Sequence, residues 1–280
     1  MAYHSDRYEK EPIFRLWLAV MLGMASTLAV QILHKMLDLP SYSDPPELMK
    51  TLAVSYITAG MVEELAKFGI IMFFVYRWCD LDEYYDGPLY AGMVGIGFAI
   101  SENIEYMCVP LIRILPIADY LIPEGAQEAG LRILLQYRIF PAHFAFDFIA
   151  GYFVTLAKFS GLPRSTLKRV CYVVAGYLVA VVLHGSYNAV AGLLSPYYFM
   201  GYCALLVMLM LMVGKAALNR SCFREDAPEV LQGLRIEGRL RRGRSQDEEE
   251  ISPGQLAAFL LVTTVFQFFL FFINTLLSGL

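Results

Sequence analysis

Charged residues are scarce in this chain, at 17% of 280 residues, whereas 58% are hydrophobic and the mean hydropathy is +0.52. This composition excludes an ordinary water-soluble domain, which needs more charge on its surface. The small net charge of −4 gives no support for nucleic-acid binding. The chain is predicted to be a membrane protein, with the lipid bilayer as its surroundings.

Cysteine pairs and internal repeats are also lacking. The five cysteines form no CxxC pair, which argues against a disulfide framework and against a cysteine metal site. The absence of a repeat weakens an inverted-repeat transporter. No linker divides the chain, so we predict one integral-membrane domain over residues 1–280.

Hydrophobic windows of spanning length predict an all-α, polytopic helix bundle of about seven transmembrane helices. We place them at 13–36, 48–78, 88–113, 131–158, 167–194, 197–218 and 255–278. The first is interpreted as a retained signal anchor. Most lysines and arginines lie before it and in alternate loops, including 219–254. The positive-inside rule then predicts a multi-pass protein of the cell membrane, with a cytoplasmic N-terminus and an extracytoplasmic C-terminus.

Polar side chains interrupt four of these apolar windows, where a charged group costs about 2.5 kcal/mol or more at membrane depth. They are Glu63, Glu64 and Lys67; Glu102 and Asn103; His143 and Asp147; and His184 and Asn188. Their predicted depths agree to within a few helical turns, in the outer half of the bilayer. The sequence therefore predicts a polar site inside the bundle that opens to the extracytoplasmic face.

The two adjacent glutamates cannot have the same role, because neighbouring residues on a helix point about 100° apart. Lys67 follows Glu63 by four residues and Glu64 by three, so its ammonium can neutralise either one. A buried ion pair that fixes helix register would explain the lysine and one glutamate. It leaves the second glutamate, which is available to act on water.

Each histidine precedes another polar residue by four positions, which places both on one helix face. Asp147 could orient His143, and Asn188 could stand beside His184 as a second hydrogen-bond donor. A carboxylate that activates water and donors that stabilise an oxyanion are the groups needed for peptide hydrolysis. No serine or cysteine lies in a comparable arrangement, so water is the expected nucleophile.

Four motifs occur in order on successive predicted helices: EELAK (63–67), FAISEN (98–103), HFAFD (143–147) and HGSYN (184–188). Together they resemble the PrsW family of intramembrane proteases, which is similar to the type II CAAX prenyl endopeptidases and the bacterial CPBP/Abi proteins. The resemblance covers a core of about 48–195. The loop 219–254 and the last predicted helix, 255–278, lie beyond it.

The resemblance implies a role for each motif residue. Glu63 and His143 would activate water, and His184 and Asn188 would form the oxyanion site. Glu64 and Glu102 would complete the catalytic set, with Lys67, Asn103 and Asp147 in support. It also implies a single-pass membrane protein as substrate, with site-1 cleavage of an anti-sigma factor as the precedent.

Two alternatives remain open for these residues. Zinc could be held by His143, His184, Glu63 and Glu102, but without an HExxH motif we favour a glutamic mechanism with no cofactor. Chains of acids and histidines also mark ion paths, so a proton or cation transporter is the alternative of another class. A silent binding scaffold would leave the four polar helices unexplained.

Overall fold

The computed structural model describes residues 11–37, 48–78, 80–112, 141–159 and 165–220. Within these ranges the chain is helical and has no strand. The helices are α2 (Ile13–Leu37), α3 (Leu48–Ala53), α4 (Glu64–Phe73), α5 (Asp86–Ile112), α8 (Ala142–Phe159), α9 (Thr166–Leu193) and α10 (Pro196–Leu218). A π-helix, η1 (Val54–Glu63), joins α3 to α4, and a short 3₁₀ turn, η2 (Val75–Arg77), follows α4.

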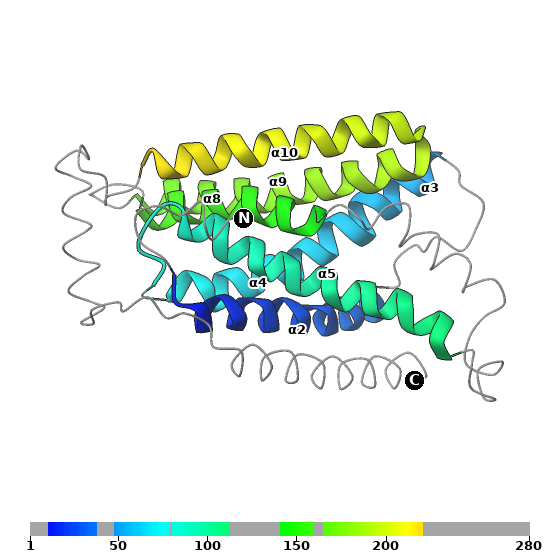
Figure 1. Ribbon diagram of the computed structural model, residues 1–280, viewed down its shortest axis with the longest axis horizontal. Coiled ribbons are helices and arrows are strands. Elements are labelled where there is room, and N and C mark those ends of the chain that lie inside the picture. Colours follow the sequence, from blue (N-terminus) through cyan, green and yellow to red (C-terminus); the bar gives the residue numbers. More distant parts are fainter. Residues whose placement is uncertain (1–10, 38–47, 79, 113–140, 160–164, 221–280) are drawn as a thin grey trace.

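The helices form one bundle in which α5 packs between α2 and α8 (Figure 1). Next to α8 lies α9, which also packs against η1. The hydrophobic core of the bundle is formed by side chains such as Tyr90 and Val94 of α5, Ile71 of α4 and Val154 of α8, all at most 1% exposed. The helices that carry the polar motifs are therefore neighbours in space.

Three described helices are long and apolar enough to cross a membrane: α2, α9 and α10. On α9, Val170, Val174, Leu178 and Val182 recur every four residues and are each about half exposed. An apolar stripe at this spacing lies on one face of the helix and suits contact with lipid tails. The membrane assignment thus agrees with the structure, while the count of seven spans and the orientation remain predictions.

The predicted spans agree with most of the described helices and differ clearly in one. The window 48–78 is not one uniform α-helix, because its middle third is wound as a π-helix and α4 ends at Phe73. The window 131–158 is described only from Pro141, after which α8 begins. Residues 131–140, most of the loop 219–254 and the predicted helix 255–278 lie outside the described residues.

Glycines allow α2 and α5 to approach closely. A β-carbon on Gly97 would lie 1.9 Å from the carbonyl oxygen of Val20, and one on Gly23 would lie 2.0 Å from that of Val94. No side chain can occupy either position, so the two backbones lie in direct contact. This contact holds the part of α5 that carries Glu102 against the first helix of the bundle.

We predict that Gly97→Ala destabilises the protein, by about 1–3 kcal/mol, because the helices must separate to admit the methyl group. Gly201→Ala on α10 is the matched control: no atom lies within 4 Å of its added β-carbon, and the change favours the helix. Thermal unfolding of both variants in detergent micelles checks this. Equal melting temperatures for the two would contradict the packing described here.

Candidate active site

The buried ammonium of Lys67 joins α4 to α8. Its Nζ lies 2.7 Å from Oε1 of Glu64 and 3.1 Å from Oδ2 of Asp147. It is also 3.2 Å from Nδ1 of His143. Lys67, Glu64 and Asp147 are all 0% exposed. The sequence left open which glutamate pairs with Lys67, and the structure shows a direct ion pair with Glu64.

The two histidines of the site, His143 and His184, are each held by a carboxylate. Nδ1 of His184 lies 2.7 Å from Oε1 of Glu64, the same oxygen that contacts Lys67. Nε2 of His143 lies 2.7 Å from Oε2 of Glu102. Because an ammonium can only donate, Nδ1 of His143 accepts from Lys67, and its proton is on Nε2, facing Glu102. The orientation of His143 is thus set by Glu102 and Lys67, while Asp147 pairs with Lys67.

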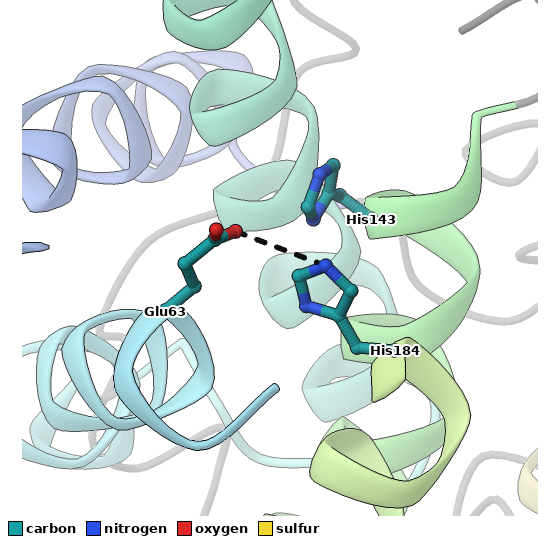
Figure 2. A group of neighbouring side chains, drawn as sticks. All are labelled: Glu63, His143 and His184. Carbon is teal, nitrogen blue, oxygen red and sulfur yellow. Dashed lines mark ion pairs between the residues drawn. The ribbon is translucent and has the colours of Figure 1, made fainter. Parts of the chain in front are cut away.

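Glu63 faces both imidazole rings. Figure 2 shows its carboxylate, His143 and His184 converging from three different helical segments. Oε2 of Glu63 lies 3.8 Å from Nε2 of His184, and the two rings are 4.9 Å apart. The side chain of Glu63 is 13% exposed, whereas that of Glu64 is 0% exposed. Glu63 is therefore the member of the pair that can meet water or a substrate.

Aromatic rings enclose the polar groups. The ring of Phe98 lies 5.0 Å from that of His143 and 5.1 Å from the ammonium of Lys67. Phe146 stacks on His184 with a centroid separation of 5.1 Å. The sequence interpretation did not single out these two residues. Their spacing was the available signal, because Phe98 precedes Glu102 by four positions and Phe146 follows His143 by three, on the same helix faces.

The two asparagines predicted for the site, Asn103 and Asn188, lie at its edge. Asn188 is half-buried on α9, one turn beyond His184, and takes no part in the contacts given above. Asn103 is adjacent to Glu102 on α5, and its side-chain oxygen is buried with no hydrogen-bond partner among the described residues. The structure therefore brings Glu63, Glu64, Lys67, Glu102, His143, Asp147 and His184 into one cluster and leaves Asn103 and Asn188 at its edge.

The cluster has the donor set of a metal site. One ligand atom from each of Glu63, His143 and His184 lies within 4.8 Å of the other two. Imidazole nitrogen and carboxylate oxygen are ordinary zinc ligands. The bond from Glu64 to His184 is the kind that orients a ligating histidine by its other ring nitrogen. The residue types thus fit a zinc-type ion, which His143 would ligate through Nε2 only in place of the proton it directs at Glu102.

Comparisons with known proteins identify the family of this chain. The sequence model of a family described as "PrsW family intramembrane metalloprotease" matches residues 11–215. The chain belongs to the PrsW family. It is 28% identical to Protease PrsW of Bacillus subtilis (strain 168) over 70% of this chain and 78% of the relative. It is 30% identical to Protease PrsW of Geobacillus kaustophilus (strain HTA426) over 66% and 71%, respectively. No solved structure gave a significant match.

Membership in the PrsW family confirms the resemblance seen in the four motifs and makes this protein a peptidase. It thereby decides between the two functional classes that the sequence had left open, in favour of the enzyme over the transporter. The choice between a glutamic and a metal-dependent mechanism lies within this peptidase class, as does the role of each residue in the cluster.

We predict that Lys67→Met costs about 3–5 kcal/mol of stability, because it leaves buried carboxylates without their cation. Lys168→Met, at an exposed position at the start of α9, is the matched control and is expected to cost less than about 0.5 kcal/mol. Denaturant unfolding of both variants measures the difference. Similar stabilities would show that the Lys67 ion pairs do not hold α4 against α8.

Proposed function

We propose that this PrsW-family peptidase cleaves single-pass membrane proteins near the extracytoplasmic face, using water as the nucleophile and Glu63 as the general base. The observation that carries the proposal is the convergence of Glu63, His143 and His184 from three helical segments. The partial exposure of Glu63 and the complete burial of Glu64 support Glu63 as the base.

The proposed reaction begins with a water molecule between Glu63 and the peptide carbonyl. Glu63 accepts a proton as the water oxygen bonds to the carbonyl carbon. The resulting oxyanion accepts hydrogen bonds from His184 and Asn188. The C–N bond then breaks, and Glu63 returns the proton to the departing amine nitrogen.

The fixed groups around Glu63 suit these roles. Because Glu64 holds Nδ1 of His184 at 2.7 Å, a protonated ring presents its Nε2–H toward the reacting space, and the adjacent carboxylate stabilises the imidazolium. Lys67 and Glu102 hold His143 from both ring nitrogens. The rings of Phe98 and Phe146 reduce the access of bulk water, which strengthens the electrostatic interactions inside the site.

A metal-dependent mechanism is the second candidate, favoured by the 4.8 Å convergence of ligand atoms. Glu63, His143 and His184 would hold the ion, which would supply Lewis-acid activation of water. Glu64 would orient His184. Glu102, beside His143, would then be the carboxylate that is free to accept the proton released by the activated water. The two mechanisms share the same residues and differ in the role of Glu63.

The substrate proposal rests on the family resemblance. PrsW-like proteins are implicated in site-1 cleavage of membrane-anchored anti-sigma factors, and an anti-sigma factor is our proposed partner here. We call Glu63, His143 and His184, with the residues that hold them, the catalytic cluster. We propose that the chain lies in the cell membrane with its N-terminus in the cytoplasm and its C-terminus outside. A substrate whose scissile bond lies near the outer face would then meet the cluster from that side.

We predict that Glu63→Gln lowers cleavage of a single-pass reporter in proteoliposomes at least about 100-fold, because the amide cannot accept the proton from water. Asp80→Asn, at an acid that pairs with Arg15 away from the cluster, is the matched control and is expected to retain cleavage. The melting temperature of each variant shows whether it is folded. Undiminished cleavage by a folded Glu63→Gln variant would refute the role of Glu63 as base.

A chelation experiment separates the two mechanisms. A glutamic mechanism predicts that a strong zinc chelator leaves cleavage unchanged and that purified protein carries no stoichiometric metal in elemental analysis. Loss of cleavage on chelation, recovery with zinc and loss of bound zinc in His184→Ala would instead establish the metal-dependent mechanism. Zinc content is a readout independent of activity, so it also informs on variants that do not cleave.

A further inference from the structure

A second group of carboxylates, buried except for the half-buried Asp82, lies at the end of the bundle where α2 and α5 begin (Figure 1). Glu11 precedes α2, Asp82 and Glu83 precede α5, and Asp86 is its first residue. Glu11 and Glu83 are 1% exposed and Asp86 is 0% exposed. We call Glu11, Asp82 and Asp86 the acidic cluster. It lies about 24 Å from Glu102 along α5, at about 1.5 Å per residue.

The geometry of the acidic cluster matches the coordination shell of a cation. One carboxylate oxygen from each of its three residues lies within 4.8 Å of the other two. Calcium–oxygen distances of about 2.3–2.6 Å place ligands on opposite sides of the ion about 4.6–5.2 Å apart, and magnesium needs slightly less. Only oxygen ligands are offered, which suits these hard cations better than zinc.

Asp86 provides an independent sign of a missing ligand. Its Oδ2 accepts the backbone N–H groups of Asp82 and Glu83, at 2.8 Å and 2.5 Å. This turn at the start of α5 explains one oxygen of the carboxyl group. The other, Oδ1, is buried and has no hydrogen-bond partner among the described residues. A buried carboxylate oxygen left in this state carries a full desolvation cost, which a bound cation removes.

Two described side chains at this end of the bundle, Arg15 and Tyr90, add no positive charge to the acidic cluster. Arg15 is directed at Asp80, with Nε 2.8 Å from Oδ2, and its guanidinium stacks over Trp78. Tyr90 donates its hydroxyl hydrogen to Oε2 of Glu11, which fixes that carboxylate in place but adds no positive charge. Several like charges buried together need protons or a cation.

We propose that Glu11, Asp82 and Asp86 bind a hard divalent cation, Mg²⁺ or Ca²⁺, that fastens the start of α2 to the start of α5. The two ends are far apart in the sequence, and α2 and α5 also meet at Gly23 and Gly97. The ion stabilises the bundle that carries the catalytic cluster and takes no part in peptide hydrolysis. This site is separate from the Glu63, His143 and His184 cluster and does not depend on the proposed mechanism.

Terbium, a luminescent substitute for calcium, tests the proposal directly. The ring of Trp78 lies 5.1 Å from that of Tyr90, whose hydroxyl group binds Glu11. Excited indole and phenol rings near the acidic cluster should therefore sensitise bound Tb³⁺. We expect purified full-length protein in detergent, freed of metal by chelation, to give sensitised Tb³⁺ emission that Ca²⁺ or Mg²⁺ abolishes by competition.

Variants assign the emission to one of the two clusters. Asp86→Asn and Glu11→Gln are expected to weaken Tb³⁺ binding about tenfold or more, whereas Glu63→Gln is expected to leave it unchanged. In the wild type and in Glu63→Gln, Ca²⁺ or Mg²⁺ should raise the melting temperature, and Glu11→Gln should lose that rise. Glu11 lies before α2 and outside any described helix, so this variant keeps the test informative if Asp86→Asn does not fold.

Two results would overturn the proposal. Tb³⁺ emission that is lost in Glu63→Gln but kept in Asp86→Asn and Glu11→Gln would place the bound ion in the catalytic cluster. An absence of emission, with no change of melting temperature in Ca²⁺ or Mg²⁺, would show that the carboxyl groups of the acidic cluster share protons and bind no cation.

Discussion

The ion pair between Lys67 and Glu64 is the interaction on which the candidate active site depends. Both side chains are 0% exposed, and their 2.7 Å contact lies among further carboxylates. Separating either partner would leave a charge in a medium that solvates it poorly. The pair therefore fixes the rotamers of both residues, and through them the positions of His184 and His143. The reacting groups are held by buried electrostatics more than by local helix propensity.

The same ion pair separates the functions of the two adjacent glutamates. Because Lys67 follows Glu64 by three residues, it lies above Glu64 on one helix face, and Glu63 points about 100° away. The helix changes there from π to α winding, since η1 ends at Glu63 and α4 begins at Glu64. Short π segments often occur at functional sites, where they turn a side chain off the ordinary helical register. Here the change occurs at the proposed base.

Close packing between η1 and α9 completes the site. A β-carbon on Gly60 would lie 3.1 Å from the carbonyl oxygen of Val181 and 3.5 Å from the backbone nitrogen of Gly185. The small residue thus lets the turn before Glu63 approach the turn that carries His184. The 3.8 Å contact between Oε2 of Glu63 and Nε2 of His184 is a consequence of this approach.

The spacing of polar residues within each helix predicted much of this arrangement. It placed Lys67 within reach of Glu64, and the prediction that four polar helices share one site matches the cluster that the structure describes. It could not show that Glu102 holds His143, because that contact depends on how α5 packs against α8. The π-helix and the acidic cluster were also missed. The acidic cluster joins segments distant in sequence, as in the contact of Glu11 with Tyr90, and periodicity does not detect such contacts.

The two buried clusters obey one physical rule and differ in how they satisfy it. Carboxylates removed from water need a compensating charge, a proton or a metal. At the proposed catalytic cluster an internal ammonium compensates part of the charge, and two imidazoles stand beside Glu63, which suits the proposed proton transfer to and from a substrate. The acidic cluster offers only oxygen atoms, and its nearby guanidinium is directed at Asp80. Among the described residues, nitrogen donors thus suit the first cluster to the proposed chemistry, whereas the oxygen ligands of the second suit the proposed hard cation.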